Sequence, residues 1–190
     1  MILNYQQIGF KWLENAVEAS RFSNFNKLDR LDRIQFLKIL LLDIWILNSD
    51  RNAYNLNLLI QRINGKDRII AIDHGMSFYS LPFNEFGVVF NSGIEISAQG
   101  SLLSVDDIRS LLAKTRGIQD MVNQAISEFE QSVVTMRLDL HLILSRIPQQ
   151  WGIDVNHIQT VLNSTIFDRS WSHNAVRVQF LQYLKQMNII

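Results

Sequence analysis

Two short polar blocks, separated by a predicted β-hairpin, hold the residues whose types and spacing could do chemistry. The block at 48–55 contains Asp50 and Asn55, and the block at 72–75 contains Asp73. Two carboxylates and a carboxamide supply the oxygen ligands that Mg²⁺ prefers. Phosphoryl transfer also needs a carboxylate that orients the attacking hydroxyl. A divalent-cation and phosphate site is therefore one interpretation; for a single loop aspartate the other is an Asx turn, in which the side chain bonds its own backbone.

The hairpin is predicted from an Asn-Gly pair at 64–65 that lies between two runs rich in Ile and Leu. Asn-Gly suits a type I′ turn because both central residues need positive φ. Counting back from this turn places Leu56 opposite Asp73 and Asn55 opposite His74. Facing residues of an antiparallel pair lie about 5 Å apart at Cα, so we expect the hairpin to gather the polar side chains at its open end.

The remaining chain reads as helical. A segment from about 29 to 47 becomes apolar on all sides in its second half, which predicts a buried helix that delivers the 48–55 loop from a rigid base. Ser104 and Asp107 resemble a capping box at the start of another helix. Hydrophobic spacing and Gly or Pro breaks predict the helices 7–20, 29–47, 104–117, 118–146, 154–162 and 172–186. We expect a mainly α fold with six or seven helices and one small β-hairpin at about residues 56–72 that carries the metal site.

Composition favours one soluble globular domain over residues 1–190. Hydrophobic residues make up 47% of the 190 and charged residues 19%, a proportion that disfavours a disordered chain. The net charge of +0 gives no electrostatic reason to expect nucleic-acid or membrane binding. There is no cysteine, no signal-like N-terminus and no apolar stretch of membrane-spanning length. A cytoplasmic location is the expectation.

The motif order Asp-Arg-x-x-x-Asn-x-Asn-Leu-Leu at 50–59, followed by Ile-Asp-His-Gly at 72–75, resembles the catalytic and metal-binding segments of HipA-like kinases. It is most similar to the short HipA-family kinase group and, more distantly, to the type II phosphatidylinositol 4-kinases. The similarity extends upstream through 42–44 and, more weakly, downstream through 147–151. It implies a protein-kinase-like C-terminal lobe.

The resemblance also implies roles for individual residues. Asp50 would be the catalytic-loop aspartate, with Arg51 beside it as a second catalytic residue. Asn55 and Asp73 would be the Mg²⁺ ligands and, through the metal, would bind the phosphates of ATP. The implied reaction transfers the γ-phosphate of ATP to a hydroxyl group on a protein or a small molecule.

Four neighbouring side chains have structural interpretations. Asp43 lies within an apolar helix, so its carboxylate must find donors, and we expect it to clamp the backbone of the catalytic loop. Arg51 either neutralises phosphate or forms a salt bridge to Asp73 or Asp43. Asn57 is expected on the opposite face from Asn55, where it would brace the loop. His74 is expected to be a hydrogen-bonded structural histidine.

The sequence departs from a complete kinase before the catalytic loop. It has no G-x-G-x-x-G motif and no Val-Ala-Ile-Lys strand, so the ATP-covering N-terminal lobe is predicted to be absent from this sequence. Either another chain supplies that lobe, or the sequence is a truncated form of a longer protein. The alternative function is a non-catalytic half-kinase that acts as an interaction or regulatory module in a toxin–antitoxin-like assembly. That alternative predicts an exposed apolar patch within residues 1–20. A metal-dependent hydrolase is a weaker third interpretation, because it would need a third carboxylate or a histidine.

Overall fold

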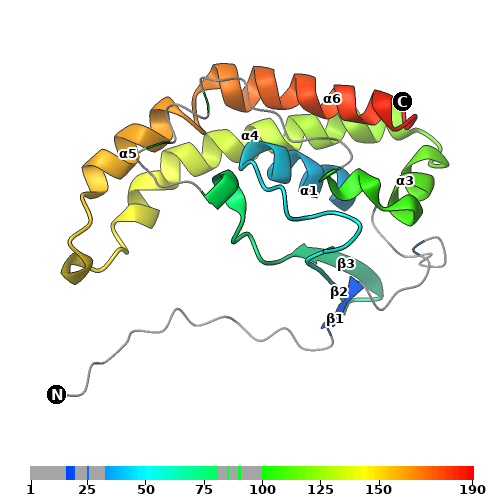
Figure 1. Ribbon diagram of the computed structural model, residues 1–190, viewed down its shortest axis with the longest axis horizontal. Helices are drawn as coiled ribbons and strands as arrows, with labels where there is room; N and C mark the ends of the chain where they lie inside the picture. The colour runs from blue at the N-terminus through cyan, green and yellow to red at the C-terminus, as the bar shows by residue number, and fades with distance from the viewer. Residues whose placement is uncertain (1–15, 20–24, 26–32, 81–84, 86–89, 91–99) are drawn as a thin grey trace.

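A long bundle of helices lies on one side of a small sheet in the computed structural model (Figure 1). The structure describes residues 16–19, 25, 33–80, 85, 90 and 100–190. Within these ranges there are five α-helices: α1 (Ile34–Trp45), α3 (Asp106–Ala113), α4 (Ile118–Leu144), α5 (Val155–Ser164) and α6 (Val176–Gln186). The sheet has three strands: β1 (Ala16–Glu18), β2 (Leu58–Ile63) and β3 (Lys66–Ala71). The predicted mainly α fold is confirmed, and β2 and β3 form the predicted hairpin. Among the described residues there are five α-helices against the six or seven predicted, and β1 adds a third strand to the hairpin.

Helix α1 is the centre of the molecule. It packs against α4 and α6 and also contacts β3, so side chains on every side of it are buried. The buried members are Ile34, Phe36, Leu37, Ile39, Leu40, Leu41, Asp43, Ile44 and Trp45. The prediction of a buried helix here is confirmed, although α1 ends two residues before the expected Leu47.

Two tryptophans fix the C-terminal end of α1. The Trp45 indole donates to the carbonyl of Ile166 at 2.7 Å, and the Trp171 indole donates to the carbonyl of Trp45 at 3.0 Å. Trp171 belongs to a π-helical segment, Ser170–Ala175, which precedes α6. These two bonds satisfy both buried indole N–H groups and connect the end of α1, from which the polar loop departs, to residues 166 and 171.

The predicted hairpin is present and in the predicted register. Strand β2 pairs antiparallel with β3, with Ile63 opposite Lys66. Asn64 has φ 49° and Gly65 has φ 77°, so both central residues adopt the positive φ that a type I′ turn requires. Pairing ends at Leu58 opposite Ala71. The expected facing of Leu56 with Asp73 and of Asn55 with His74 is therefore wrong as strand pairing.

Replacing Gly65 with valine tests this turn. A β-branched residue at positive φ is expected to destabilise the protein by about 1–2 kcal/mol, because Cβ collides with the neighbouring backbone. Asn64→Gly keeps positive φ accessible and is the matched control, with an expected change within about 0.5 kcal/mol. Urea unfolding measures both, and equal losses in the two variants would contradict the turn assignment.

Two other expectations about local structure are wrong. Residues 16–18, which were predicted to belong to a helix at 7–20, form strand β1, in which Val17 pairs with Ile60. Residues 1–15, which include most of the predicted apolar patch, lie outside the described ranges. Pairing with β2 overrides the helical spacing there. No capping box forms at Ser104, because α3 begins at Asp106 and its N-cap, Val105, makes no side-chain cap bond. No helix in the described part of the chain is long and apolar enough to cross a membrane.

The other helices follow the predicted segments closely. Helix α4 covers 118–144 against the expected 118–146, and α5 covers 155–164 with Asp154 as its N-cap. The carboxylate of Asp154 accepts the N–H groups of Asn156 and His157, which satisfies two free donors of the first turn. The segment expected at 172–186 divides into the π-helical turn and α6.

Candidate functional site

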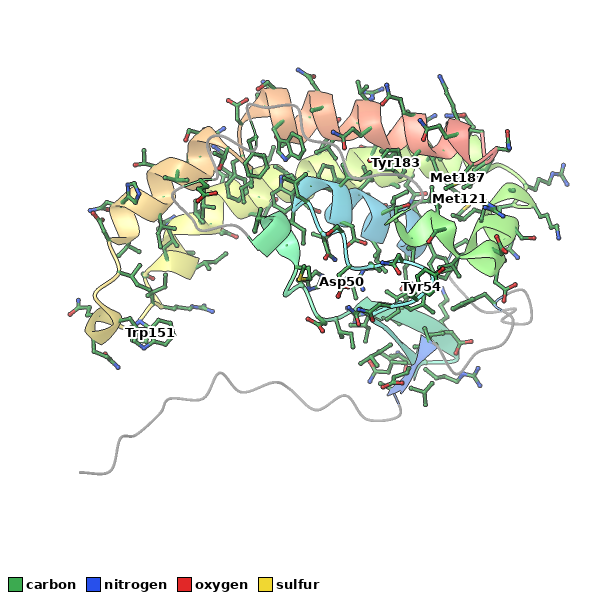
Figure 2. The ribbon with its side chains drawn as sticks, viewed as in Figure 1. Asp50, Tyr54, Met121, Trp151, Tyr183 and Met187 are labelled. Carbon is green, nitrogen blue, oxygen red and sulfur yellow. The ribbon has the colours of Figure 1, made fainter. Side chains whose placement is uncertain are left out.

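The polar loop leaves α1 through a tight reversal. The Asn48 N–H donates to the carbonyl of Asp43 at 2.8 Å, and Leu47 adopts φ 51°. The carbonyl of Ile46 accepts the N–H of Phe78, which joins this reversal to the segment that follows the hairpin. The loop therefore starts from a defined position between the helices and the sheet, where Figure 2 shows Asp50.

A buried cluster joins Asp43 of α1 to Asn48 and Arg51 of the loop. The Asp43 carboxylate accepts Arg51 Nε at 2.9 Å and Asn48 Nδ2 at 2.9 Å. Arg51 is 0% exposed and Asp43 3% exposed. Burial raises the pKa of Asp43 to about 6, and the opposing effects of the Arg51 charge and the Asn48 amide hold it no higher. Of the two salt bridges expected for Arg51, the structure forms the one with Asp43.

The Arg51 guanidinium bonds the loop to both chain segments at the open end of the hairpin. It donates to the carbonyls of Leu56 and Asn57 before β2, and to the carbonyl of Ile72 after β3. It also lies 3.3 Å from Nε2 of His74. Partial burial and then the Arg51 charge lower the pKa of His74, which the nearby Asp73 partly offsets. A neutral, hydrogen-bonded His74 matches the structural role predicted for it.

Asp50 and Asn55 are in direct contact. Oδ2 of Asp50 accepts Nδ2 of Asn55 at 2.8 Å and Nδ2 of Asn57 at 3.1 Å. Asn57 therefore does brace the loop, but the expectation that it would point away from Asn55 is wrong. Strand alternation fails there because Asn57 has φ 44° and β2 begins only at Leu58. Within the described part of the chain, Oδ1 of Asp50 and the side-chain oxygen of Asn55 have no hydrogen-bond donor and can act as acceptors.

A four-residue turn presents Asn55. Asn52 and Asn55 exchange main-chain hydrogen bonds of 3.0 and 3.2 Å, and the Asn52 side chain accepts the N–H of Tyr54. Ser104 holds the tip of the turn by accepting the N–H of Ala53 at 3.0 Å. Sequence reasoning did not find this role of Ser104, and its only sequence signal was interpreted as a helix cap.

Asp73 lies at the exit of the hairpin with its carboxylate exposed. It has φ 51°, and its Oδ1 accepts the N–H of Gly75 at 3.2 Å, which forms an Asx turn. A Cβ added at Gly75 would lie 3.2 Å from the same oxygen, so glycine allows the carboxylate to fold back. Asp73 follows Ile72, whose carbonyl is bonded to Arg51, but the structure forms no direct contact between Asp73 and Asp50 or Asn55.

A hollow of about 230 Å³ opens beside Asn55. Its apolar wall is made by Leu56, Leu58 and Ile72, and Glu18 of β1 lines it as well. Sequence reasoning missed Glu18 because its segment was predicted to be helical. The hollow is smaller than the roughly 300–1,000 Å³ of most small-molecule sites, so these residues alone form a floor and not an enclosed pocket.

Asp50, Asn55 and Asp73 carry oxygen atoms of the chemical type that binds Mg²⁺. Mg²⁺ is usually held by one or two carboxylates together with substrate phosphates and water. The structure brings Asp50 and Asn55 into contact, and it shows no contact between Asp73 and either of them within the described residues. No group of three or more His, Cys, Asp or Glu side chains that could hold a metal is present among the described residues.

Comparison with known proteins adds no further assignment. No family model, no curated protein and no solved structure matches the chain.

Proposed function

We propose that the chain is the C-terminal lobe of a HipA-like, kinase-fold phosphotransferase that transfers the γ-phosphate of ATP to a hydroxyl acceptor. The observation that carries the proposal is the Asp50 carboxylate, which two asparagine amides hold at the open end of a hairpin whose exit carries Asp73. A catalytic-loop carboxylate, an amide ligand and a second carboxylate are the parts that phosphoryl transfer requires.

Each residue has a defined task in this proposal. The oxygen of Asp50 that is not bonded to Asn55 and Asn57 accepts the proton of the acceptor hydroxyl and orients it for attack. Asn55 and Asp73 would hold Mg²⁺, which would supply positive charge to stabilise the transferring phosphoryl group. Arg51 acts as a positioning residue, since its buried guanidinium is bonded to Asp43 and to backbone carbonyls of both strand ends.

The hollow beside Asn55 supports a role for a second chain. Its wall of Leu56, Leu58 and Ile72 suits the apolar face of a nucleotide base, but its volume of about 230 Å³ leaves a nucleotide uncovered. We therefore propose that a β-rich lobe, supplied by another polypeptide, covers the nucleotide and brings the phosphate-binding lysine. This partner would form the active enzyme together with the chain.

Binding of Mg-ATP tests the metal assignment. Asp73→Asn removes the exposed carboxylate without disturbing a buried group, and we expect at least about a tenfold weaker affinity for Mg-ATP because the metal loses a charged ligand. Titration calorimetry with the purified chain, alone and with candidate partner proteins, measures this. The matched control is Asp139→Asn, an exposed aspartate on α4 that is expected to leave binding unchanged.

Two results would contradict the proposal. Equal Mg-ATP affinity in the wild type and Asp73→Asn would refute the metal assignment. No nucleotide binding under any of these conditions would favour the alternative function, a non-catalytic half-kinase that acts as an interaction module.

A further inference from the structure

A second groove lies at the other end of the hairpin, between β3 and α1. Its volume is about 540 Å³, more than twice that of the hollow beside Asn55. The apolar part of its lining comes from Ile39 of α1 and from Ile63 and Ile69 of the hairpin. Ile63 is 38% exposed, so apolar surface remains open to a ligand at this groove.

The charged residues at the groove are mainly basic, and Lys66 and Arg68 extend from the exposed face of β3 at its edge. Lys38, Lys66 and Arg68 contribute three cations, and Asp67 is the one carboxylate among the lining residues. Asp67 is 3% exposed and is neutralised by a fork of hydrogen bonds from Arg62 at 2.8 and 3.1 Å. A local excess of positive charge therefore persists in a chain whose net charge is +0.

Lys66 and Arg68 are the cations that remain open to a ligand. Lys38 forms an ion pair with Glu128 of α4. Lys66 and Arg68 are exposed, and neither forms an ion pair within the part of the chain that the structure describes. Two adjacent, unneutralised cations beside apolar surface match a ligand that has carboxylates next to aliphatic groups.

The shape of the groove favours an extended chain. Strand β3 is an edge of the three-stranded sheet. The register turns the main-chain groups of Asp67 and Ile69 away from β2, and the Gln35 side chain already accepts the Ile69 N–H at 2.6 Å. Asp67 lies two residues nearer the turn, where its outward main-chain groups can pair with an extended peptide.

We propose that this groove binds an extended acidic segment of a partner protein, in which carboxylate and aliphatic side chains alternate. The carboxylates would lie on the exposed sheet face of Lys66 and Arg68, and the aliphatic side chains would lie on the opposite face, against Ile39 and Ile69. Strand β2, from Leu58 near the Asp50 site to Ile63 at the groove, spans about 17 Å. The two sites are therefore separate, and the proposed peptide binding does not rest on the proposed kinase function.

Charge reversal of the two free cations tests the proposal on the full chain. The probe is a fluorescein-labelled octapeptide of alternating aspartate and leucine, and fluorescence anisotropy measures its binding. We expect the double variant Lys66→Glu, Arg68→Glu to bind it about tenfold or more weakly. The control is Arg169→Glu, Arg177→Glu, which makes the same change of charge at exposed positions near the start of α6.

The outcomes separate the alternatives. Binding that is lost with Lys66 and Arg68, retained in the control and absent for a lysine–leucine octapeptide supports the proposal. No binding by the wild type, or equal binding by both double variants, would overturn it. Tighter binding of a single-stranded oligonucleotide of the same charge, lost in the same variant, would overturn the peptide assignment in favour of a phosphate backbone.

Discussion

Arg51→Met is expected to destabilise the protein by about 3–5 kcal/mol, which is the usual cost of removing one partner from a buried ion pair. The variant leaves the Asp43 carboxylate buried with only the Asn48 amide, and it removes the donor from the carbonyls of Leu56, Asn57 and Ile72. Urea or thermal unfolding measures the loss. Arg51→Lys is expected to recover only part of it, because an ammonium group cannot reproduce the planar fork.

The pH dependence of this loss identifies its cause. Without the Arg51 charge the pKa of Asp43 rises further above about 6, since burial is no longer opposed by a cation. A carboxyl whose pKa is higher in the folded state than in the unfolded state binds protons more tightly when folded, so acidification favours folding. The loss of stability caused by Arg51→Met is therefore expected to be largest above the raised pKa of Asp43 in the variant, and to shrink as the pH falls below that value.

A surface arginine provides the control. Arg109→Met removes the exposed ion pair with Asp106 and is expected to change stability by less than about 0.5 kcal/mol at any pH. A comparable loss in the two variants, or a penalty for Arg51→Met that does not vary with pH, would show that the buried Asp43–Arg51 pair does not hold the loop.

The parts of the fold that depend on local rules could be predicted. Asn64-Gly65 determines the hairpin because few residue pairs accept positive φ twice in succession. The all-round apolar sequence of α1 and the apolar stripe of α4 determine two helices, since each is long enough for its pattern to be unambiguous. In each case the signal lies within the element itself.

The errors arise where a distant segment decides the local structure. Strand β1 exists because β2 offers it a pairing edge, which no spacing within residues 16–18 reveals. Ser104 bonds the turn at Ala53, 51 residues earlier, instead of capping its own helix. The alternation of side chains along a strand predicted the wrong face for Asn57. Regular strand pairing ends before Asn57, because Asn57 and Asp73 both adopt positive φ.

The candidate site was predicted in its composition but only partly in its geometry. Residue types identified Asp50, Asn55 and Asp73, and the structure brings Asp50 and Asn55 into contact. Arg51 was assigned beside Asp50 as a catalytic residue, whereas its side chain is 0% exposed and bonded to Asp43 and to the hairpin ends. Sequence adjacency could not separate these roles, because the direction of a loop side chain depends on the hydrogen bonds it finds in the fold.

Under the proposed kinase function, Asp50→Asn is expected to lower phosphoryl-transfer turnover by about 10²–10⁴-fold while leaving Mg-ATP binding unchanged. An asparagine retains one acceptor oxygen for the amides of Asn55 and Asn57, so the loop keeps its main contacts. It has no charge with which to accept the proton of the attacking hydroxyl. Mg²⁺-dependent ATP consumption by the chain, with and without a candidate covering partner, measures turnover, and calorimetry on the same samples measures binding.

The contrast between two aspartates makes this experiment specific. Asp73→Asn is expected to lose binding and turnover together, Asp50→Asn turnover alone, and the exposed control Asp139→Asn neither. Full turnover in Asp50→Asn would exclude that carboxylate as the group that orients the hydroxyl. Loss of binding in both site variants would instead make Asp50 part of the metal site, an arrangement that its shared hydrogen bond with Asn55 would then explain.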